Sequence, residues 1–123
     1  DVGSNPCFSF GASGTQLKLN GFTITGKADP VTGCGGAIFA REVGITTNGL
    51  NGLTVRGPGL IQRFRNHGVS VTGSTLARVE GVTVATNCGA GIFVASNSFG
   101  TLVQENVAVR NGSTAPGFSC GGI

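Results

Sequence analysis

Short runs of alternating apolar and polar residues recur along the whole chain. Apolar side chains stand two residues apart, with a polar or outward residue between them, at 53–55, 69–71, 92–94 and 107–109. Period-two alternation gives a strand one inward apolar face and one outward face. Glycine, asparagine and serine separate the runs, where the chain needs tight turns or positive φ. The pattern predicts an all-β chain of many short strands.

Two motifs return in step along these strands. The first, Cys-Gly followed by small residues and Ile, occurs at 34–40, 88–94 and 120–123, and the second, typified by Asn-Gly-Leu-Thr-Val, occurs at 20–25, 51–56, 80–85 and 105–110. The marker positions Gly21, Gly52, Gly81 and Asn106 are 31, 29 and 25 residues apart. Such returns are typical of a solenoid. Stacked parallel strands lie about 4.8 Å apart, so each return adds one coil.

The chain resembles the right-handed parallel β-helix of pectate lyases and other polysaccharide-active proteins. The resemblance covers 14–123 and rests on the Asn-Gly-Leu-Thr-Val-type strands and on Asn66, Asn87 and Asn111 near turns. It implies one all-β domain over 1–123, a right-handed parallel β-helix of about four to five coils with about three strands per coil. We place a partial N-terminal coil at 1–20, coils at about 21–51, 52–80 and 81–105, and a partial C-terminal coil at 106–123.

The repeat also weighs against another all-β fold and leaves the function open. A sandwich of hairpins would use Asn20-Gly21 and Asn51-Gly52 as turns. Glu80-Gly81 stands before the equivalent strand, so a bend between strands of one coil explains the pattern better. Proteins that look like this include lyases, hydrolases, epimerases and structural fibres, so the fold alone names no activity.

Composition narrows the class of protein. Only 11% of residues are charged, and the net charge of +3 is scattered singly rather than gathered in the basic stripe of a nucleic-acid binder. The apolar stretches are too short for a membrane-spanning helix. Methionine is absent and the four cysteines are even in number. These features favour a processed chain that is secreted or on the cell surface.

The cysteines suggest a disulfide pairing. In the predicted register Cys34, Arg65, Cys88 and Cys120 occupy one position of successive coils. Neighbouring coils bring Cα atoms to about 5 Å, within disulfide range, whereas two coils separate them by about 10 Å. We therefore expect Cys7 to pair with Cys34 and Cys88 with Cys120, and not Cys34 with Cys88. Reduced, buried cysteines are the alternative, and zinc is disfavoured because no Cys-x-x-Cys pair exists.

Catalytic chemistry has few candidates. The resemblance implies an outward cluster of aspartates with an arginine or lysine, but the acids are only Asp1, Asp29, Glu42, Glu80 and Glu105. Glu80 and Glu105 are predicted at equivalent positions of adjacent coils, where a carboxylate pair could do acid–base work or, with Asn51, hold calcium. Arg56 and Arg110 lie close enough in register to neutralise them. We favour ion pairing and expect no metal or other cofactor; His67 is interpreted as a turn residue rather than a base.

The surface and the coil ends carry the remaining hypotheses. Phe39 and Phe93 are predicted to point outward, where they could stack on a sugar, and Thr23, Thr54, Thr83 and Ala108 are predicted to form one outward column. Ile123 stops inside a predicted strand, and uncapped coils expose strand edges that invite self-association. We therefore favour a non-enzymatic, secreted, disulfide-stabilised structural protein that stacks through its ends into a fibre or surface assembly. A carbohydrate-binding or polysaccharide-cleaving β-helix, or a fragment of one, is the alternative.

Overall fold

The computed structural model describes residues 5–28, 34, 42–112 and 122–123, and the strands in these ranges are all short. They are β1 (Phe8–Ser9), β2 (Gln16–Lys18), β3 (Thr23–Thr25), β4 (Ile45–Thr46), β5 (Thr54–Arg56), β6 (Leu60–Gln62), β7 (Val69–Val71), β8 (Arg78–Glu80), β9 (Thr83–Ala85), β10 (Ile92–Val94), β11 (Leu102–Gln104) and β12 (Val107–Val109). Within the described ranges there is no helix that could cross a membrane.

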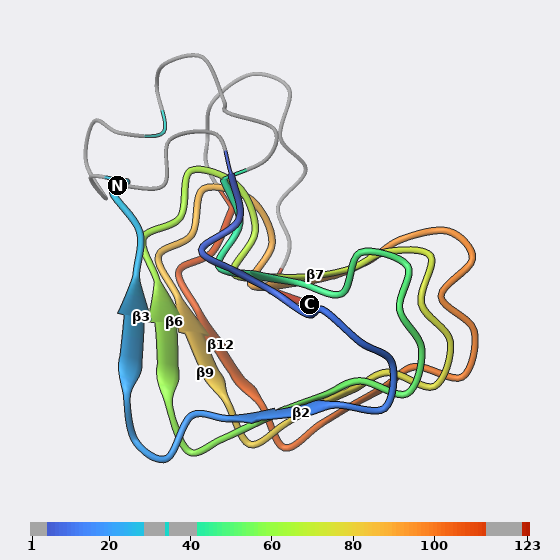
Figure 1. Ribbon diagram of the computed structural model, residues 1–123. Helices are drawn as coiled ribbons and strands as arrows, with labels where there is room; N and C mark the ends of the chain where they lie inside the picture. The colour runs from blue at the N-terminus through green and yellow to red at the C-terminus, as the bar shows by residue number, and fades with distance from the viewer. Residues whose placement is uncertain (1–4, 29–33, 35–41, 113–121) are drawn as a thin grey trace.

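Three parallel sheets make up the architecture. Their strand orders are β1-β4-β7-β10, β2-β5-β8-β11 and β3-β6-β9-β12, and we call them the β1, β2 and β3 sheets (Figure 1). Every third strand returns to the same sheet, beside its predecessor and parallel to it. In Figure 1 the three sheets form the sides of the coil, with β3, β6, β9 and β12 side by side. The predicted all-β parallel solenoid of about four coils, with three strands per coil, is confirmed.

The interior consists of three columns of apolar side chains, one from each sheet. They are Phe8, Ile45, Val69 and Ile92; Leu17, Val55, Val79 and Val103; and Ile24, Ile61, Val84 and Ala108. In the two middle coils these side chains are at most 1% exposed. Full burial of a valine or isoleucine contributes about 1.5 to 3 kcal/mol, so the columns supply the main driving force for stacking.

Coil length is uneven because extra residues enter between β3 and β4. In the β1 sheet Phe8 pairs with Ile45, Ile45 with Val69 and Val69 with Ile92, which gives steps of 37, 24 and 23 residues. The later coils are therefore nearly regular. The irregular steps read from the sequence came from one misplaced segment.

The predicted alignment of 20–25 with 51–56 is wrong. Thr23 pairs with Leu60, whereas Thr54 pairs with Gln16 and Arg78 in another sheet. Both segments are a glycine followed by an alternating strand, so their patterns do not tell which sheet each one joins. The predicted coil boundary between 21–51 and 52–80 moves accordingly, and the predicted column of outward threonines is divided between two sheets.

A column of glycines brings the coils together just before the β1 sheet. Backbone N–H groups of Ile45, Val69 and Ile92 donate to the carbonyls of Gly68, Gly91 and Gly122 at 3.0, 2.9 and 3.2 Å. A Cβ on Gly68 would lie 2.7 Å from the Gly91 oxygen, and one on Gly91 would lie 2.7 Å from the Gly122 oxygen. Gly44 is similarly enclosed by Gly68 and Ile61. Only glycine fits these close approaches between backbones.

Buried asparagines satisfy the backbone at the corner beside this column. Asn87, 2% exposed, accepts a hydrogen bond from the Phe64 N–H at 3.0 Å. Its amide donates to Asn111 Oδ1 at 2.9 Å, and the Asn111 amide donates to the Val84 carbonyl at 2.9 Å. Backbone groups that the bend removes from the sheet ladders thereby regain partners, which a buried corner requires.

A left-handed residue turns the chain from the β1 sheet to the β2 sheet in each coil. The residues in this conformation are Gly14, Gly52, Leu76 and Gly100, with φ of 72°, 64°, 57° and 66°. Leu76 breaks the glycine series, although a β-carbon is unfavourable there. Its side chain is 66% exposed and adds little to the interior.

The first Cys-Gly motif is not a coil of the β1 sheet. Ile45, not Ile38, pairs with Val69. The predicted register would have placed Ala37 in the glycine column, where a Cβ does not fit, whereas Gly44 meets that requirement. The rest of the motif, 35–41, lies outside the described residues, and so does Phe39.

The predicted disulfide pairing is also wrong. Cys34 is bonded to Cys88, with their Cα atoms 5.4 Å apart, and Cys7 is a free, exposed cysteine. Cys34 lies among the extra residues between β3 and β4, so the spacing of stacked coils does not fix its distance from Cys88. Cys7 lies instead beside β4, with its N–H bonded to the Val43 carbonyl at 2.9 Å. Cys120 lies outside the described residues.

The glycine column gives a stability prediction for Gly68→Ala. The added methyl group would meet the Gly91 oxygen and the Asn87 amide, at 2.7 and 2.8 Å. We expect the free energy of unfolding to fall by roughly 1 to 3 kcal/mol, the usual cost of overpacking. Urea unfolding measures the change. Gly11→Ala is the matched control because nothing lies within 4 Å of its new Cβ; equal effects of the two variants would contradict the steric argument.

Candidate functional site

The outer face of the β1 sheet carries one continuous column of side chains. Ser9 pairs with Thr46, Thr46 with Ser70, and Ser70 with Phe93, so these four residues occupy one outward position in four successive coils. The sequence predicted the outward position of Phe93, and the side chain is 40% exposed. At about 4.8 Å per coil, the column is about 14 Å long.

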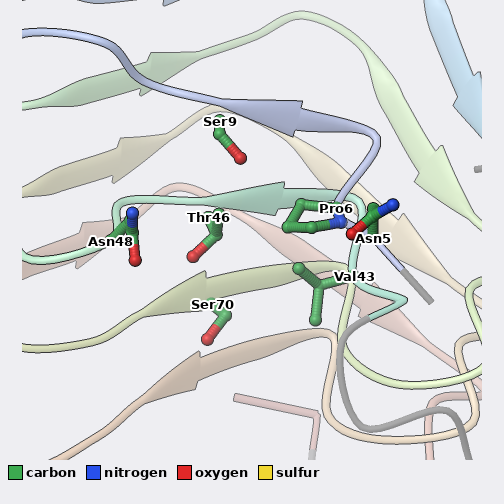
Figure 2. Close-up of a pocket in the computed structure, with 7 residues that line it drawn as sticks. All are labelled: Asn5, Pro6, Ser9, Val43, Thr46, Asn48 and Ser70. Atoms are coloured by element: carbon green, nitrogen blue, oxygen red, sulfur yellow. The ribbon is translucent and has the colours of Figure 1, made fainter.

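A groove of about 510 Å³ lies over three of these positions. Figure 2 shows the hydroxyl groups of Ser9, Thr46 and Ser70, which come from three neighbouring strands. Asn48 lies toward one side, and Asn5, Pro6 and Val43 lie toward the other. The groove therefore combines hydroxyl and amide groups with small apolar surfaces. None of the described residues that line it is charged.

Buried hydroxyl groups hold the corner that carries Asn48. Thr47, 1% exposed, accepts hydrogen bonds at Oγ1 from the Ser74 hydroxyl at 2.7 Å and from the Thr72 N–H at 3.1 Å. The Thr72 hydroxyl in turn lies 3.2 Å from the Ser70 hydroxyl. These contacts tie the outward Ser70 to a fixed, fully bonded corner.

An aromatic pair continues the groove at the fourth coil. The rings of Phe93 and His67 are stacked, with centroids 4.3 Å apart and planes within 4° of parallel. His67 Nδ1 accepts a hydrogen bond from the Ala90 N–H at 3.0 Å, so the neutral ring carries its proton on Nε2. Burial lowers the pKa of His67 below its ordinary value of 6.5, because it removes water from the charged form. His67 thus supports Phe93 as a neutral ring.

The carboxylate pair expected on the β2 sheet does not form. Glu80 pairs in register with Gln104, and Glu105 is the next residue, at the corner with φ of 56°. Both oxygens of Glu80 are engaged, one with Arg56 Nε at 3.2 Å and the other with Gln104 Nε2 at 3.1 Å. The expected pairing of Arg56 with Glu80 is thus observed. Arg110 lies at a different corner, with φ of 52°.

The calcium hypothesis has the same outcome. Asn51 lies at the corner before the β2 sheet and accepts a hydrogen bond from the Thr75 N–H at 2.8 Å, whereas Glu80 ends a strand of that sheet. Asn51, Glu80 and Glu105 are therefore not brought together as a ligand set. In the part of the chain that the structure describes, no three His, Cys, Asp or Glu side chains are grouped to bind a metal ion.

An ion pair that the sequence reasoning missed joins Glu42 to Arg65. Glu42 is 1% exposed, and its backbone carbonyl accepts a hydrogen bond from the Asn66 N–H. A buried carboxylate needs such a partner. The signal was present in the step of 24 residues between successive coils, which places Glu42 close to Arg65. We assign the pair to structure, because it locks the insertion to the next coil.

The lowered pKa of His67 predicts a pH dependence of stability. Between that lowered pKa and 6.5 the unfolded chain binds a proton that the folded chain does not. The contribution to stability is therefore complete above 6.5 and is lost as the pH falls below it. In urea unfolding from about pH 7.5 to about pH 5, we expect His67→Gln to show a shallower loss than the unmodified chain. Parallel profiles would contradict this assignment.

Comparison with protein-family models, curated proteins and solved structures finds no match for this chain. The parallel solenoid is established by the strand pairing itself. The use of its outer face has to be argued from the column Ser9–Thr46–Ser70–Phe93, its groove and the stacked His67.

Proposed function

We propose that the chain is a carbohydrate-binding β-helix whose site is the outer face of the β1 sheet. The observation that carries the proposal is the continuous column in which three hydroxyl side chains lead to an exposed aromatic ring. Hydroxyl and amide groups can exchange hydrogen bonds with sugar hydroxyls as both donors and acceptors. The negative face of an aromatic ring attracts the weakly positive C–H groups of a sugar.

The stacked histidine supports this use of Phe93. An exposed phenylalanine is a hydrophobic liability on a strand surface unless its exposed face has a partner. One face of the ring lies on His67, which fixes its orientation, and the ring is still 40% exposed. A preoriented ring loses less conformational entropy on binding than a mobile one.

Binding without cleavage is the better proposal for this chain. The carboxylate of Glu80 is held by Arg56 and Gln104 and lies on a different sheet from the groove. The resemblance to polysaccharide-active β-helices favours a glycan as the ligand. A disulfide between Cys34 and Cys88 favours secretion or display on the cell surface, where disulfides persist.

Phe93→Ala tests this function. Loss of a stacking contact worth about 0.5 to 1.5 kcal/mol corresponds to roughly two- to tenfold weaker affinity. The measurement is retardation in gels that contain soluble polysaccharides, chosen as a panel of galactomannan, xyloglucan, dextran, polygalacturonate and alginate. Phe99→Ala is the control because Phe99 is also exposed, at 69%, but lies at a corner outside the column. Absence of retardation in every gel would reject the function.

End-to-end self-association is a second candidate function, with its own observation. The interior columns are only partly buried at both ends of the stack, at Phe8, Leu17 and Ile24 in the first coil and at Val103 and Ala108 in the last. The strands there are the edges of all three sheets. A first coil of one copy placed on the last coil of another would cover both apolar ends and continue the sheets, as in a filament.

Leu102→Lys tests the self-association. A lysine on an edge strand opposes further pairing, and Leu102 lies in the edge strand β11 with 38% exposure. We expect the unmodified chain to sediment as larger species with rising concentration, and the variant to require about tenfold more protein for the same shift. Leu76→Lys, at an exposed corner of an inner coil, is the control. A monomer at every concentration would reject this function.

A further inference from the structure

The distribution of charge on the coil separates the β1 sheet from the β2 sheet. The β2 sheet presents Lys18, Arg56, Arg78 and Glu80 outward, in the strands β2, β5 and β8. The groove of the β1 sheet is lined by seven residues that are all uncharged, and Phe93 extends it. A ligand bound there meets hydroxyl, amide and aromatic groups but no charged partner among the described lining residues.

This lining disfavours an acidic ligand. A carboxylate or sulfate that leaves water for a site without a cation or a set of aligned donors loses solvation that nothing replaces. Neutral sugar hydroxyls, in contrast, match hydroxyl and amide side chains one for one. The basic side chains that an acidic glycan would need are on another face of the coil, at Lys18, Arg56 and Arg78.

The shape of the face also fixes the direction of the ligand. Each strand of the β1 sheet is two or three residues long and presents one outward side chain of the column before the chain turns. Along a strand the face is therefore narrow. Across the strands it repeats a similar hydroxyl position at about 4.8 Å in three coils and then presents Phe93. A linear ligand contacts the whole column only when it lies along the solenoid axis.

We infer, resting on the carbohydrate-binding function proposed above, that the ligand is a neutral linear polysaccharide lying along the solenoid axis across β1, β4, β7 and β10. Ser9, Thr46 and Ser70 exchange hydrogen bonds with successive sugar units, and Phe93 stacks on the unit at the far end. Asn48, at the edge of the groove, adds an amide to the same polymer.

The class of ligand is tested by the same gel panel at two ionic strengths. We expect retardation by galactomannan or xyloglucan that is unchanged between about 50 mM and about 500 mM sodium chloride, because no charge pair is screened. Retardation only by polygalacturonate or alginate, abolished by salt and by Arg56→Gln, would overturn this inference while leaving carbohydrate binding in place. Retardation by no polysaccharide would overturn both.

The orientation is tested with neutral oligosaccharides of increasing length, prepared from the polysaccharide that retards the chain. Calorimetry should show affinity rising until the oligosaccharide is about 14 Å long, the extent of the four coils. Phe93→Ala and Ser9→Ala, at opposite ends of the column, should each weaken the long oligosaccharide, by roughly two- to tenfold and two- to fivefold. A disaccharide should respond to at most one of them.

Thr23→Ala is the matched control for Ser9→Ala. Thr23 also faces outward from a first-coil strand, but it belongs to the β3 sheet. Its replacement should leave the affinity unchanged. Full affinity for a disaccharide, or a long oligosaccharide indifferent to Ser9→Ala, would overturn the axial orientation. Circular dichroism of each variant separates a lost contact from a lost fold.

Discussion

Close approach of the coils at the glycine column governs the rest of the structure. At Gly44, Gly68, Gly91 and Gly122 one backbone contacts the next with no room for a Cβ. The hydrogen bonds made there lead directly into the β1 sheet, so they set the register of every strand that follows. Three-residue strands have too few hydrogen bonds to fix a register alone, and a one-residue slip would exchange the inward and outward faces.

Register is also what creates the candidate site. Because the coils align, a single outward position repeats from coil to coil as Ser9, Thr46, Ser70 and Phe93. The same alignment stacks Ile45, Val69 and Ile92 inward, so the apolar interior and the polar face share one cause. Rigidity of the stack then supplies binding groups that are already oriented. His67 extends this principle to the aromatic ring at the end of the column.

Separate faces of one coil carry separate chemistry. The β2 sheet places its charges where they pair with one another, as Arg56 and Glu80 do, and a surface pair of this kind adds little stability. The β1 sheet keeps uncharged groups over its groove. A solenoid allows this division because each side of the coil is a sheet with its own outward column, and a substitution in one column leaves the other two in place.

The sequence by itself determined the all-β solenoid, its three strands per coil and the outward position of Phe93, because period-two alternation and recurring glycines are local properties. Pairing of segments far apart in the chain was decided only by the tertiary structure. The segments 20–25 and 51–56 look alike but join different sheets, and Cys34 reaches Cys88 through an insertion that follows no coil spacing. The steric requirement at Gly44 chose Ile45 over Ile38, since a contact between two backbones shows itself only when both are in place.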